Sequence, residues 1–192
     1  MDSIILMGIK HCGKSTQGKR LASQLSLDFY DTDDLITFRN EGKSPRKIYL
    51  EGGEEAFKKA EAEACIWLSE KISAENKRVV IASGGGICKN QQALDALHKI
   101  GKFIFLQAEE KTAADRIIRE VRIDENGEPS CLPAYIAKKN PHSILEVRAI
   151  FHDFYSERVR LYSAIADFTV KMENSSKAEN TKKILDCIQE NF

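Results

Sequence analysis

Residues 8–15 constrain the fold of this chain more than any other stretch. They read Gly-Ile-Lys-His-Cys-Gly-Lys-Ser, with glycine at the first and sixth positions and with Lys14 and Ser15 at the end. An unbroken apolar run at 3–7, typical of a buried strand, precedes them, and a segment with apolar residues at helical spacing, 17–25, follows them. An ordinary glycine-bearing turn is the alternative, but the shared register of glycines, lysine and serine favours a phosphate-binding loop. The sequence therefore predicts a nucleoside triphosphate site.

The residue types of this loop match the chemistry of phosphate binding. Gly8 and Gly13 allow backbone angles that a Cβ atom would penalise. The N–H groups of the loop then point at phosphate oxygens from the N-terminal end of the following helix. We expect Lys14 to act on the β- and γ-phosphates as a catalytic residue and Ser15 to ligate Mg²⁺. Thr16 is expected to complete the set that binds ATP.

Composition excludes several classes of protein. The 192 residues include 29 basic and 29 acidic side chains, which leaves no basic excess for binding nucleic acid or an anionic membrane. No signal peptide, membrane span or structural metal is expected. The five scattered cysteines form no Cys-x-x-Cys pair, which favours reduced thiols in a cytoplasmic protein. We expect one domain, 1–192, that acts as a monomer.

Strand-like and helix-like segments alternate along the chain. The expected strands are 3–7, 28–30, 78–82, 102–106 and 168–172, and the expected helices are 14–24, 54–73, 90–99, 112–121 and 177–189. This alternation predicts an α/β fold in which helices cover both faces of a central parallel sheet of about five strands. Ligands of such sheets bind beyond the carboxyl ends of the strands.

Three acids follow the second expected strand, in the order Asp31-Thr32-Asp33-Asp34. One interpretation is a helix N-cap, because Asp and Thr side chains accept bonds from the free N–H groups of a first turn. The other interpretation is functional. Asp31 would hold Mg²⁺ beside the phosphate loop, and Asp33 would accept the proton of an attacking hydroxyl.

Ser83-Gly84-Gly85-Gly86 follows the third expected strand. Three consecutive glycines can form a loose turn, or they can remove every side chain where a ligand approaches the backbone. No acid ends this strand, although many P-loop hydrolases use one there to hold Mg²⁺. We therefore expect Asp31 to serve the metal, which argues against a motor or a GTPase.

Arg158 interrupts an apolar stripe in the longest helical pattern after residue 140. Asn140-Pro141 predicts the start of this helix, with asparagine as the N-cap and proline at the first helical position. Apolar residues then recur at helical spacing through Leu161. An inward guanidinium needs an anionic partner or a cleft, which we favour over an arginine that extends to solvent.

Residues 122–140 show no regular periodicity. Asn126-Gly127 predicts a turn, and Pro129 and Pro133 interrupt the segment. A long irregular segment in a compact domain is usually either disordered or a functional lid. Because a kinase must exclude water from the triphosphate, we expect a lid.

With these motifs in order, the sequence resembles the shikimate kinase family over most of its length. The motifs are the loop 8–15, Asp31-Thr32-Asp33, Glu54-Glu55-Ala56-Phe57-Lys58-Lys59-Ala60-Glu61, Gly84-Gly85-Gly86, and Arg158-Val159-Arg160-Leu161-Tyr162. The resemblance implies a three-layer α/β/α P-loop kinase fold with a lid, and ATP and Mg²⁺ as cofactors. It also implies phosphoryl transfer to a ring hydroxyl of shikimate, which gives shikimate 3-phosphate.

The resemblance implies roles for individual residues as well. Asp31 corresponds to the acid of the magnesium site, and Asp33 to the residue that binds the acceptor hydroxyls. Gly84, Gly85 and Gly86 correspond to the acceptor-binding loop. Arg158 corresponds to the arginine that binds the shikimate carboxylate, and Arg116 to the arginine beside the adenine.

The chain departs from the family pattern on the acceptor side. Lys58 stands where the family has arginine, and it either contacts the acceptor or pairs with Glu54 one turn away. Arg160 replaces a proline. The lid lacks the family's arginine followed by proline and leucines, so Arg119 or Arg122 is expected to substitute. Two alternatives stay open: a kinase for another polyhydroxylated acid or sugar such as gluconate, and a non-catalytic nucleotide-binding regulator.

Overall fold

Five strands form the central sheet of the computed structural model, which describes residues 2–125 and 127–191. Their order is β2-β3-β1-β4-β7, and each neighbouring pair is parallel. The strands are β1 (Ser3–Met7), β2 (Asp28–Asp31), β3 (Val79–Ala82), β4 (Gly101–Ala108) and β7 (Phe168–Met172). Each of them overlaps a segment for which the sequence predicts a strand, and the predicted α/β fold is confirmed.

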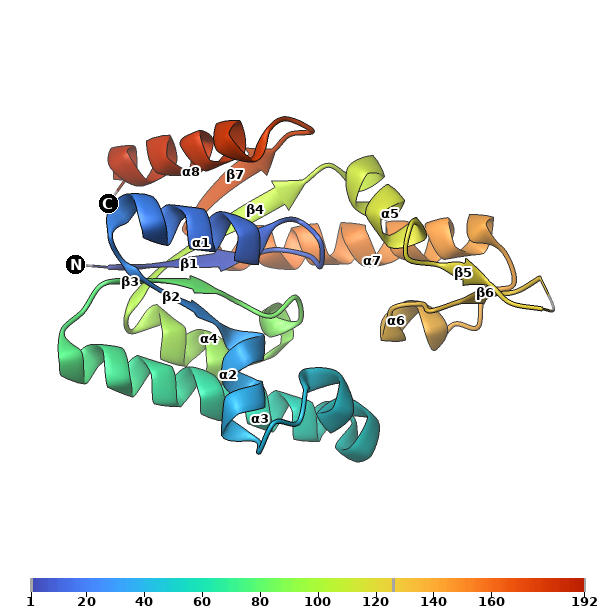
Figure 1. The fold of residues 1–192 in the computed structure, drawn as a ribbon, viewed down its shortest axis with the longest axis horizontal. Helices are drawn as coiled ribbons and strands as arrows, with labels where there is room; N and C mark the ends of the chain where they lie inside the picture. Colours follow the sequence, from blue (N-terminus) through green and yellow to red (C-terminus); the bar gives the residue numbers. More distant parts are fainter. Residues whose placement is uncertain (1, 126, 192) are drawn as a thin grey trace.

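Helices cover both faces of this sheet (Figure 1). They are α1 (Lys14–Leu25), α2 (Thr32–Arg39), α3 (Pro45–Glu75), α4 (Gln91–His98), α5 (Glu110–Ile118), α7 (Ile144–Ile165) and α8 (Lys177–Asn191). α1 packs against α8 on one side of the sheet, and α3 packs against α4 on the other. The result is the predicted three-layer arrangement. No helix within the described residues has both the length and the hydrophobicity needed to cross a membrane.

β1 lies at the centre of the sheet because its sequence is apolar on both faces. Ile4, Ile5 and Leu6 have no exposed surface, as expected for a parallel strand that helices cover on both sides. β1 pairs with β3 on one edge and with β4 on the other. The loop after Met7 therefore leaves the sheet between the carboxyl ends of two neighbouring strands, where ligands of such folds bind.

The two helices after β2 differ from the sequence prediction. α2 has no counterpart among the predicted helices. α3 begins at Pro45, well before the predicted start at Glu54, and Ser44 caps it by accepting a bond from the Lys47 N–H. Gly53, with a φ of 76°, interrupts α3 just before Glu54, so the predicted start marks this interruption.

The predicted start of α7 at Asn140-Pro141 is wrong. Asn140 has a φ of 48°, which is left-handed backbone, and α7 begins at Ile144. Ser143 is the cap, and its Oγ accepts a bond from the Glu146 N–H at 3.2 Å. A serine cap with an acid in the first turn stabilises the free N–H groups at this position, so the helix does not extend back to the proline.

The segment predicted to be an irregular lid contains short regular elements. β5 (Arg122–Ile123) and β6 (Pro129–Ser130) pair as an antiparallel hairpin, and α6 (Ala134–Ala137) follows. The predicted turn falls between β5 and β6. Asn126 lies outside the described residues, and Gly127 has a φ of 81°, which favours glycine. The hairpin projects beyond the sheet at the end of the molecule where α7 begins (Figure 1).

Candidate active site

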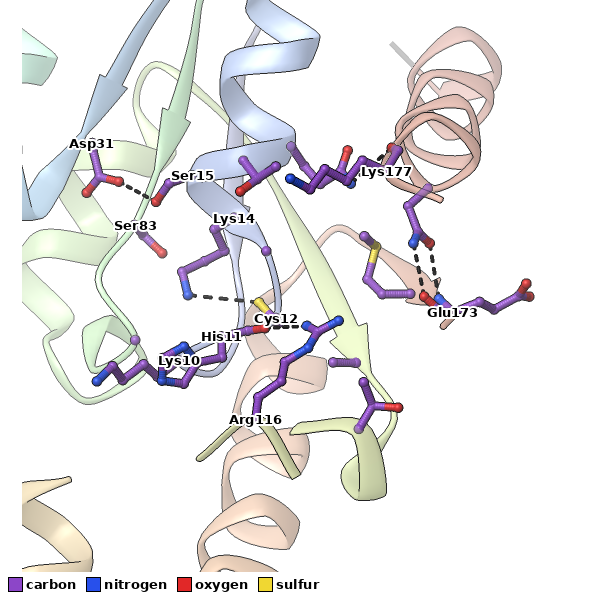
Figure 2. A pocket seen from close by; sticks show the side chains of 18 of the residues that line it. Lys10, His11, Cys12, Lys14, Ser15, Asp31, Ser83, Arg116, Glu173 and Lys177 are labelled. Atoms are coloured by element: carbon purple, nitrogen blue, oxygen red, sulfur yellow. Dashed lines mark hydrogen bonds between the residues drawn. The ribbon is translucent and has the colours of Figure 1, made fainter. Parts of the chain in front are cut away.

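A cleft of about 680 Å³ opens at the carboxyl edge of the sheet (Figure 2). Its wall includes the predicted nucleotide, metal and base residues Gly13, Lys14, Ser15, Thr16, Asp31, Asp33 and Arg116. The sheet brings them together because β1 and β2 end at the same edge. Of the described acceptor candidates, Asp33 and Gly85 belong to this wall, whereas Lys58 and Arg158 do not.

The phosphate loop has the backbone that its glycines predict. The φ angle is 149° at Gly8 and 103° at Gly13. A Cβ atom on Gly8 would lie 2.8 Å from the carbonyl oxygen of Leu106, so a larger residue would displace the loop. Lys14 Nζ donates to the carbonyl oxygens of Gly8 at 2.8 Å and Ile9 at 2.9 Å. These bonds hold the ammonium group against the loop whose N–H groups receive phosphate.

Ser15 and Asp31 form the pair of oxygen donors expected for Mg²⁺. Ser15 Oγ donates to Asp31 Oδ2 at 2.6 Å (Figure 2). Asp31 Oδ1 accepts a bond from the Asp33 N–H at 3.0 Å and caps α2. One carboxylate oxygen thus serves the helix cap while the other faces the phosphate loop. Hard oxygen donors beside phosphates suit Mg²⁺, so these residues fit the cation.

Asp33 faces the cleft from the first turn of α2. It is exposed to the solvent of the cleft, yet desolvation by the protein atoms around its carboxyl raises its pKa above the ordinary value. The carboxylate of Asp31 raises this pKa further, and the ammonium group of Lys14 opposes the shift. A carboxylate whose pKa is raised toward the working pH is a stronger proton acceptor. The environment of Asp33 therefore suits a general base.

Arg116 and Arg119 project from the end of α5 toward the nucleotide side of the cleft. Arg116 Nη1 donates to the carbonyl oxygen of His11 at 2.5 Å, which ties α5 to the phosphate loop (Figure 2). Arg119 belongs to the cleft wall. Arg122, the other candidate for a lid arginine, lies exposed on β5 outside the wall defined by the described residues. The geometry thus favours Arg119 over Arg122 for contact with phosphate.

The segment that joins β7 to α8 also lines the cleft, which the sequence analysis missed. Its cleft residues include Met172, Ser175 and Lys177. Asn180 holds this segment in place, because its Oδ1 accepts from the Glu173 N–H at 3.1 Å and its Nδ2 donates to the Glu173 carbonyl at 3.0 Å. The sequence feature that could have revealed this part of the cleft is the polar run directly after the last strand, because ligands bind at the carboxyl edge of such sheets.

The triple glycine packs closely against the acids of the site. Gly84 N–H donates to Thr32 Oγ1 at 2.8 Å. A Cβ atom on Gly84 would lie 2.9 Å from Glu61 Oε1 and 3.2 Å from Asp33 Oδ1. The Gly85 carbonyl accepts a bond from the Tyr162 hydroxyl at 2.6 Å. Close approach of neighbouring groups therefore explains the glycine at 84, whereas Gly85 and Gly86 lie in a turn, as the other interpretation of this motif expects.

Glu61 is a further acid of the site, in addition to Asp31 and Asp33, and the sequence analysis did not single it out. Its side chain on α3 is fully buried. Asn90 Nδ2 donates to its Oε2 at 2.9 Å, whereas its Oε1 has no hydrogen-bond partner in the described part of the chain. Burial, opposed by the bond from Asn90, raises the pKa of Glu61 to about 7. The sequence feature that could have revealed Glu61 is its helical spacing to Ala64 and Leu68. Both of these residues are fully buried on α3.

Arg158 and Lys58 lie behind the cleft on α7 and α3. Arg158 is half-buried, its guanidinium stands 4.9 Å from the centre of the Phe154 ring, and its Nη1 donates to Cys88 Sγ. Its Nε is buried without a partner among the residues described. Lys58 Nζ instead lies 3.1 Å from Glu54 Oε1. Arg158 thus turns inward from α7 but is not part of the cleft wall, where it was expected, and Lys58 adopts the surface pairing that was its alternative.

The class of protein follows from the way these groups face one another. A loop built for phosphates stands beside a carboxylate that can take a proton from a hydroxyl, and both open onto one cleft. This combination defines a P-loop kinase that transfers phosphate to an alcohol group.

Comparison with known proteins identifies the particular family. The family model "Shikimate kinase" matches residues 10–189. A shikimate kinase from Francisella tularensis subsp. holarctica is 32% identical over 187 residues, covering 95% of this chain and 92% of that protein. Shikimate kinase 1 from Escherichia coli O139:H28 is 30% identical over 189 residues, covering 98% and 97%. The chain belongs to the shikimate kinase family, so the predicted resemblance is confirmed.

Solved structures agree with this assignment. The crystal structure of shikimate kinase from Aquifex aeolicus has a TM-score of 0.69 and 31% identity, covering 98% of this chain and 97% of that one. The structure of shikimate kinase from Acinetobacter baumannii in complex with shikimate has a TM-score of 0.77 at 23% identity, covering 100% and 94%, and shows the same fold. ATP and Mg²⁺ are the cofactors of the family.

Proposed function

We propose that this chain transfers the γ-phosphate of ATP to the 3-hydroxyl group of shikimate. The observation that supports this proposal is the position of Asp33 between two groups of residues. Its backbone N–H donates to Asp31, one of the two residues proposed to hold the metal. Its carboxylate and that of Glu61 both lie close to Gly84: a Cβ atom built on this glycine would be 3.2 Å from Asp33 Oδ1 and 2.9 Å from Glu61 Oε1. A hydroxyl bound at Asp33 would face the phosphates held by Lys14.

The residues on the nucleotide side would hold and polarise the phosphates. ATP bound with Mg²⁺ supplies the phosphoryl group and an electrophilic phosphorus atom. Lys14 and the loop N–H groups stabilise the charge through donors that are already oriented. Ser15 and Asp31 hold the cation, and Arg116 flanks the adenine. Asp33 orients the acceptor hydroxyl and accepts its proton on a carboxylate oxygen.

The residues on the acceptor side would fix the acid. Arg158 binds the carboxylate, because a half-buried guanidinium whose Nε has no partner among the described residues makes strong charge-assisted bonds to an anion. Lys58 is a second contact that must leave its pair with Glu54, an exchange that costs little because ion pairs exposed to solvent are weak. Gly84, Gly85 and Gly86 carry no side chain that would keep the acceptor from approaching the backbone.

An ADP-release assay with shikimate, gluconate and a nucleoside monophosphate tests the reaction. We expect turnover with shikimate. Preference for gluconate would favour the alternative kinase, and ATP binding without turnover of any acceptor would favour a regulator.

Arg158→Ala tests the carboxylate contact. It should raise the KM for shikimate by roughly 30-fold or more, which corresponds to about 2 kcal/mol of binding, and leave the KM for ATP unchanged. Arg148→Ala, on the surface of the same helix where Arg148 pairs with Asp115, is the matched control. A best acceptor without a carboxylate would refute the role of Arg158.

The assembly and location of the protein are further proposals. We propose that residues 1–192 act as a single domain, as a monomer and in the cytoplasm. The five cysteines are all free, which suits a reducing compartment. Light scattering at micromolar concentration would test the monomer directly, because a dimer would double the measured mass.

A further inference from the structure

The lid carries an aromatic side chain into the region of Arg158. Tyr135, on α6, stacks on Phe154 of α7 with the ring centres 3.7 Å apart and an angle of 13° between the planes. Arg158 stands one turn further along α7 with its guanidinium 4.9 Å from the same Phe154 ring. Tyr135 of the lid and Arg158 of α7 therefore both contact the Phe154 ring.

The lid helix α6 and the turn after it contact two helices, α7 and α3. Tyr135 packs on α7, and Lys138 contacts α3 by donating to the Tyr49 hydroxyl, with its ammonium 4.9 Å from the centre of the Tyr49 ring. α3 also carries Glu61. The lid therefore contacts both α7, which carries Arg158, and α3, which carries Glu61, and Figure 1 shows α6 beside the start of α7.

Three buried polar atoms in this region have no hydrogen-bond partner within residues 2–125 and 127–191. They are Tyr135 Oη, Arg158 Nε and Glu61 Oε1. Tyr135 and Arg158 both contact the Phe154 ring, and the charge of Arg158 also acts on the Glu61 carboxyl and lowers its pKa, against the larger effect of burial. Buried polar groups in native proteins are almost always hydrogen-bonded. Three orphaned atoms from three helices indicate that a polar ligand belongs among them.

The chemistry of the three atoms specifies this ligand. Arg158 Nε can only donate, and the Tyr135 hydroxyl is free to donate. Two donors from side chains that contact the same Phe154 ring suit the oxygens of a carboxylate, and Glu61 Oε1 can accept from a ligand hydroxyl. Desolvation raises the pKa of the Tyr135 phenol, with Arg158 opposing the shift, so the phenol keeps its proton at neutral pH.

We propose that Tyr135 is a specificity-determining residue whose hydroxyl donates to the acceptor carboxylate that Arg158 binds. This inference rests on the proposed function and adds a contact delivered by the lid. Lid placement and acceptor recognition are then coupled, since the carboxylate bridges α6 and α7. An acceptor without the charge loses the bond that holds the lid helix against it.

Tyr135→Phe tests the proposal, because it keeps the ring that stacks on Phe154 and removes only the hydroxyl. The KM for shikimate should rise about ten- to a hundredfold, the range for a lost hydrogen bond to a charged group, while the KM for ATP stays unchanged. Tyr30→Phe is the matched control, since its hydroxyl accepts a bond from Lys71 near the C-terminal end of α3. That control should leave both KM values unchanged.

A second substrate separates recognition from a structural role. Tyr135→Phe should reduce the preference for shikimate over its uncharged methyl ester, whereas a loosened lid would impair both substrates alike. Equal impairment, or a Tyr135→Phe variant with the parent's KM for shikimate, overturns the role of Tyr135 and leaves the proposed function intact. A parent enzyme that turns over no carboxylate acceptor overturns both.

Discussion

Ser15 Oγ lies 2.6 Å from Asp31 Oδ2, and this bond joins the first turn of α1 to the end of β2. The same carboxylate caps α2 through its other oxygen. Asp31 therefore links the phosphate loop to the helix that carries Asp33. Asp31 thus helps to fix Asp33, the proposed base, relative to the phosphate loop.

Asp31→Asn should separate the metal role from the cap role. Asparagine caps a helix about as well as aspartate, so the free energy of unfolding should change by less than about 0.5 kcal/mol. The lost charge should raise the Mg²⁺ concentration needed for half-maximal rate about 10- to 100-fold. Titration of the rate with Mg²⁺ measures this effect. Asp34→Asn, in the same first turn, is the control, and equal Mg²⁺ dependence in both variants would refute the metal role.

Asp33→Asn should lower kcat by about 10²–10⁴, the usual contribution of a general base. The pH profile provides a second check. Because the pKa of Asp33 is raised, chiefly by desolvation, the rate of the parent should fall with decreasing pH through a limb that lies above the ordinary carboxyl range. That limb should disappear in the variant. A variant that keeps the parent's kcat would refute the general-base role and would leave Asp33 as a residue that binds the acceptor or stabilises the first turn of α2.

The nucleotide side could be predicted because its residues occupy one continuous stretch. A phosphate-binding loop of this type requires glycines, a lysine and a hydroxyl at fixed spacing. The chain meets this requirement within the eight residues 8–15, with Gly8, Gly13, Lys14 and Ser15. The parallel sheet was equally predictable, since strands buried on both faces need continuous apolar runs such as 3–7.

The acceptor side could not be predicted in the same way. Glu61, Tyr135 and Arg158 come from three helices, and their meeting depends on tertiary packing that no local pattern encodes. Tyr135 lies on a helix of four residues, which is too short to show a periodicity. The wrong start at Asn140 has a similar cause, because two adjacent cap signals compete and tertiary contacts choose between them.

Lys58→Arg should leave turnover unchanged or lower the KM for shikimate. Lys58 pairs with Glu54 at 3.1 Å on a partly exposed face of α3, and an arginine there would reach a carboxylate with two parallel donors instead of one. Steady-state kinetics with varied shikimate measure the effect. Lys59→Arg, whose side chain pairs with Glu63 on the solvent side, is the control. A higher KM in Lys58→Arg alone would show that the pocket has adapted to an acceptor other than shikimate.

Glu61→Gln should change how stability depends on pH. The ordinary pKa of this carboxyl is 4.5, and burial raises it to about 7 in the folded protein. Below pH 4.5 the carboxyl is protonated in both states and costs nothing. Between pH 4.5 and 7 only the folded state keeps the proton, so the free energy of unfolding should fall as pH rises, by on the order of 3 kcal/mol. Above pH 7 both states are ionised and the loss is constant.

Urea unfolding of the parent and of Glu61→Gln between pH 4.5 and 8 measures this contribution. The free energy of unfolding of the variant, minus that of the parent, should increase from pH 4.5 to 7 and then level off. The subtraction removes the other titrating groups and any constant cost of the amide, so a weakly destabilised variant is still informative. Glu63→Gln, an exposed position on the same helix, should give a flat difference. Parallel curves for Glu61→Gln and the parent would mean that Glu61 titrates normally, and its burial beside Asp33 and Arg158 would then have no consequence for the charge of the acceptor pocket.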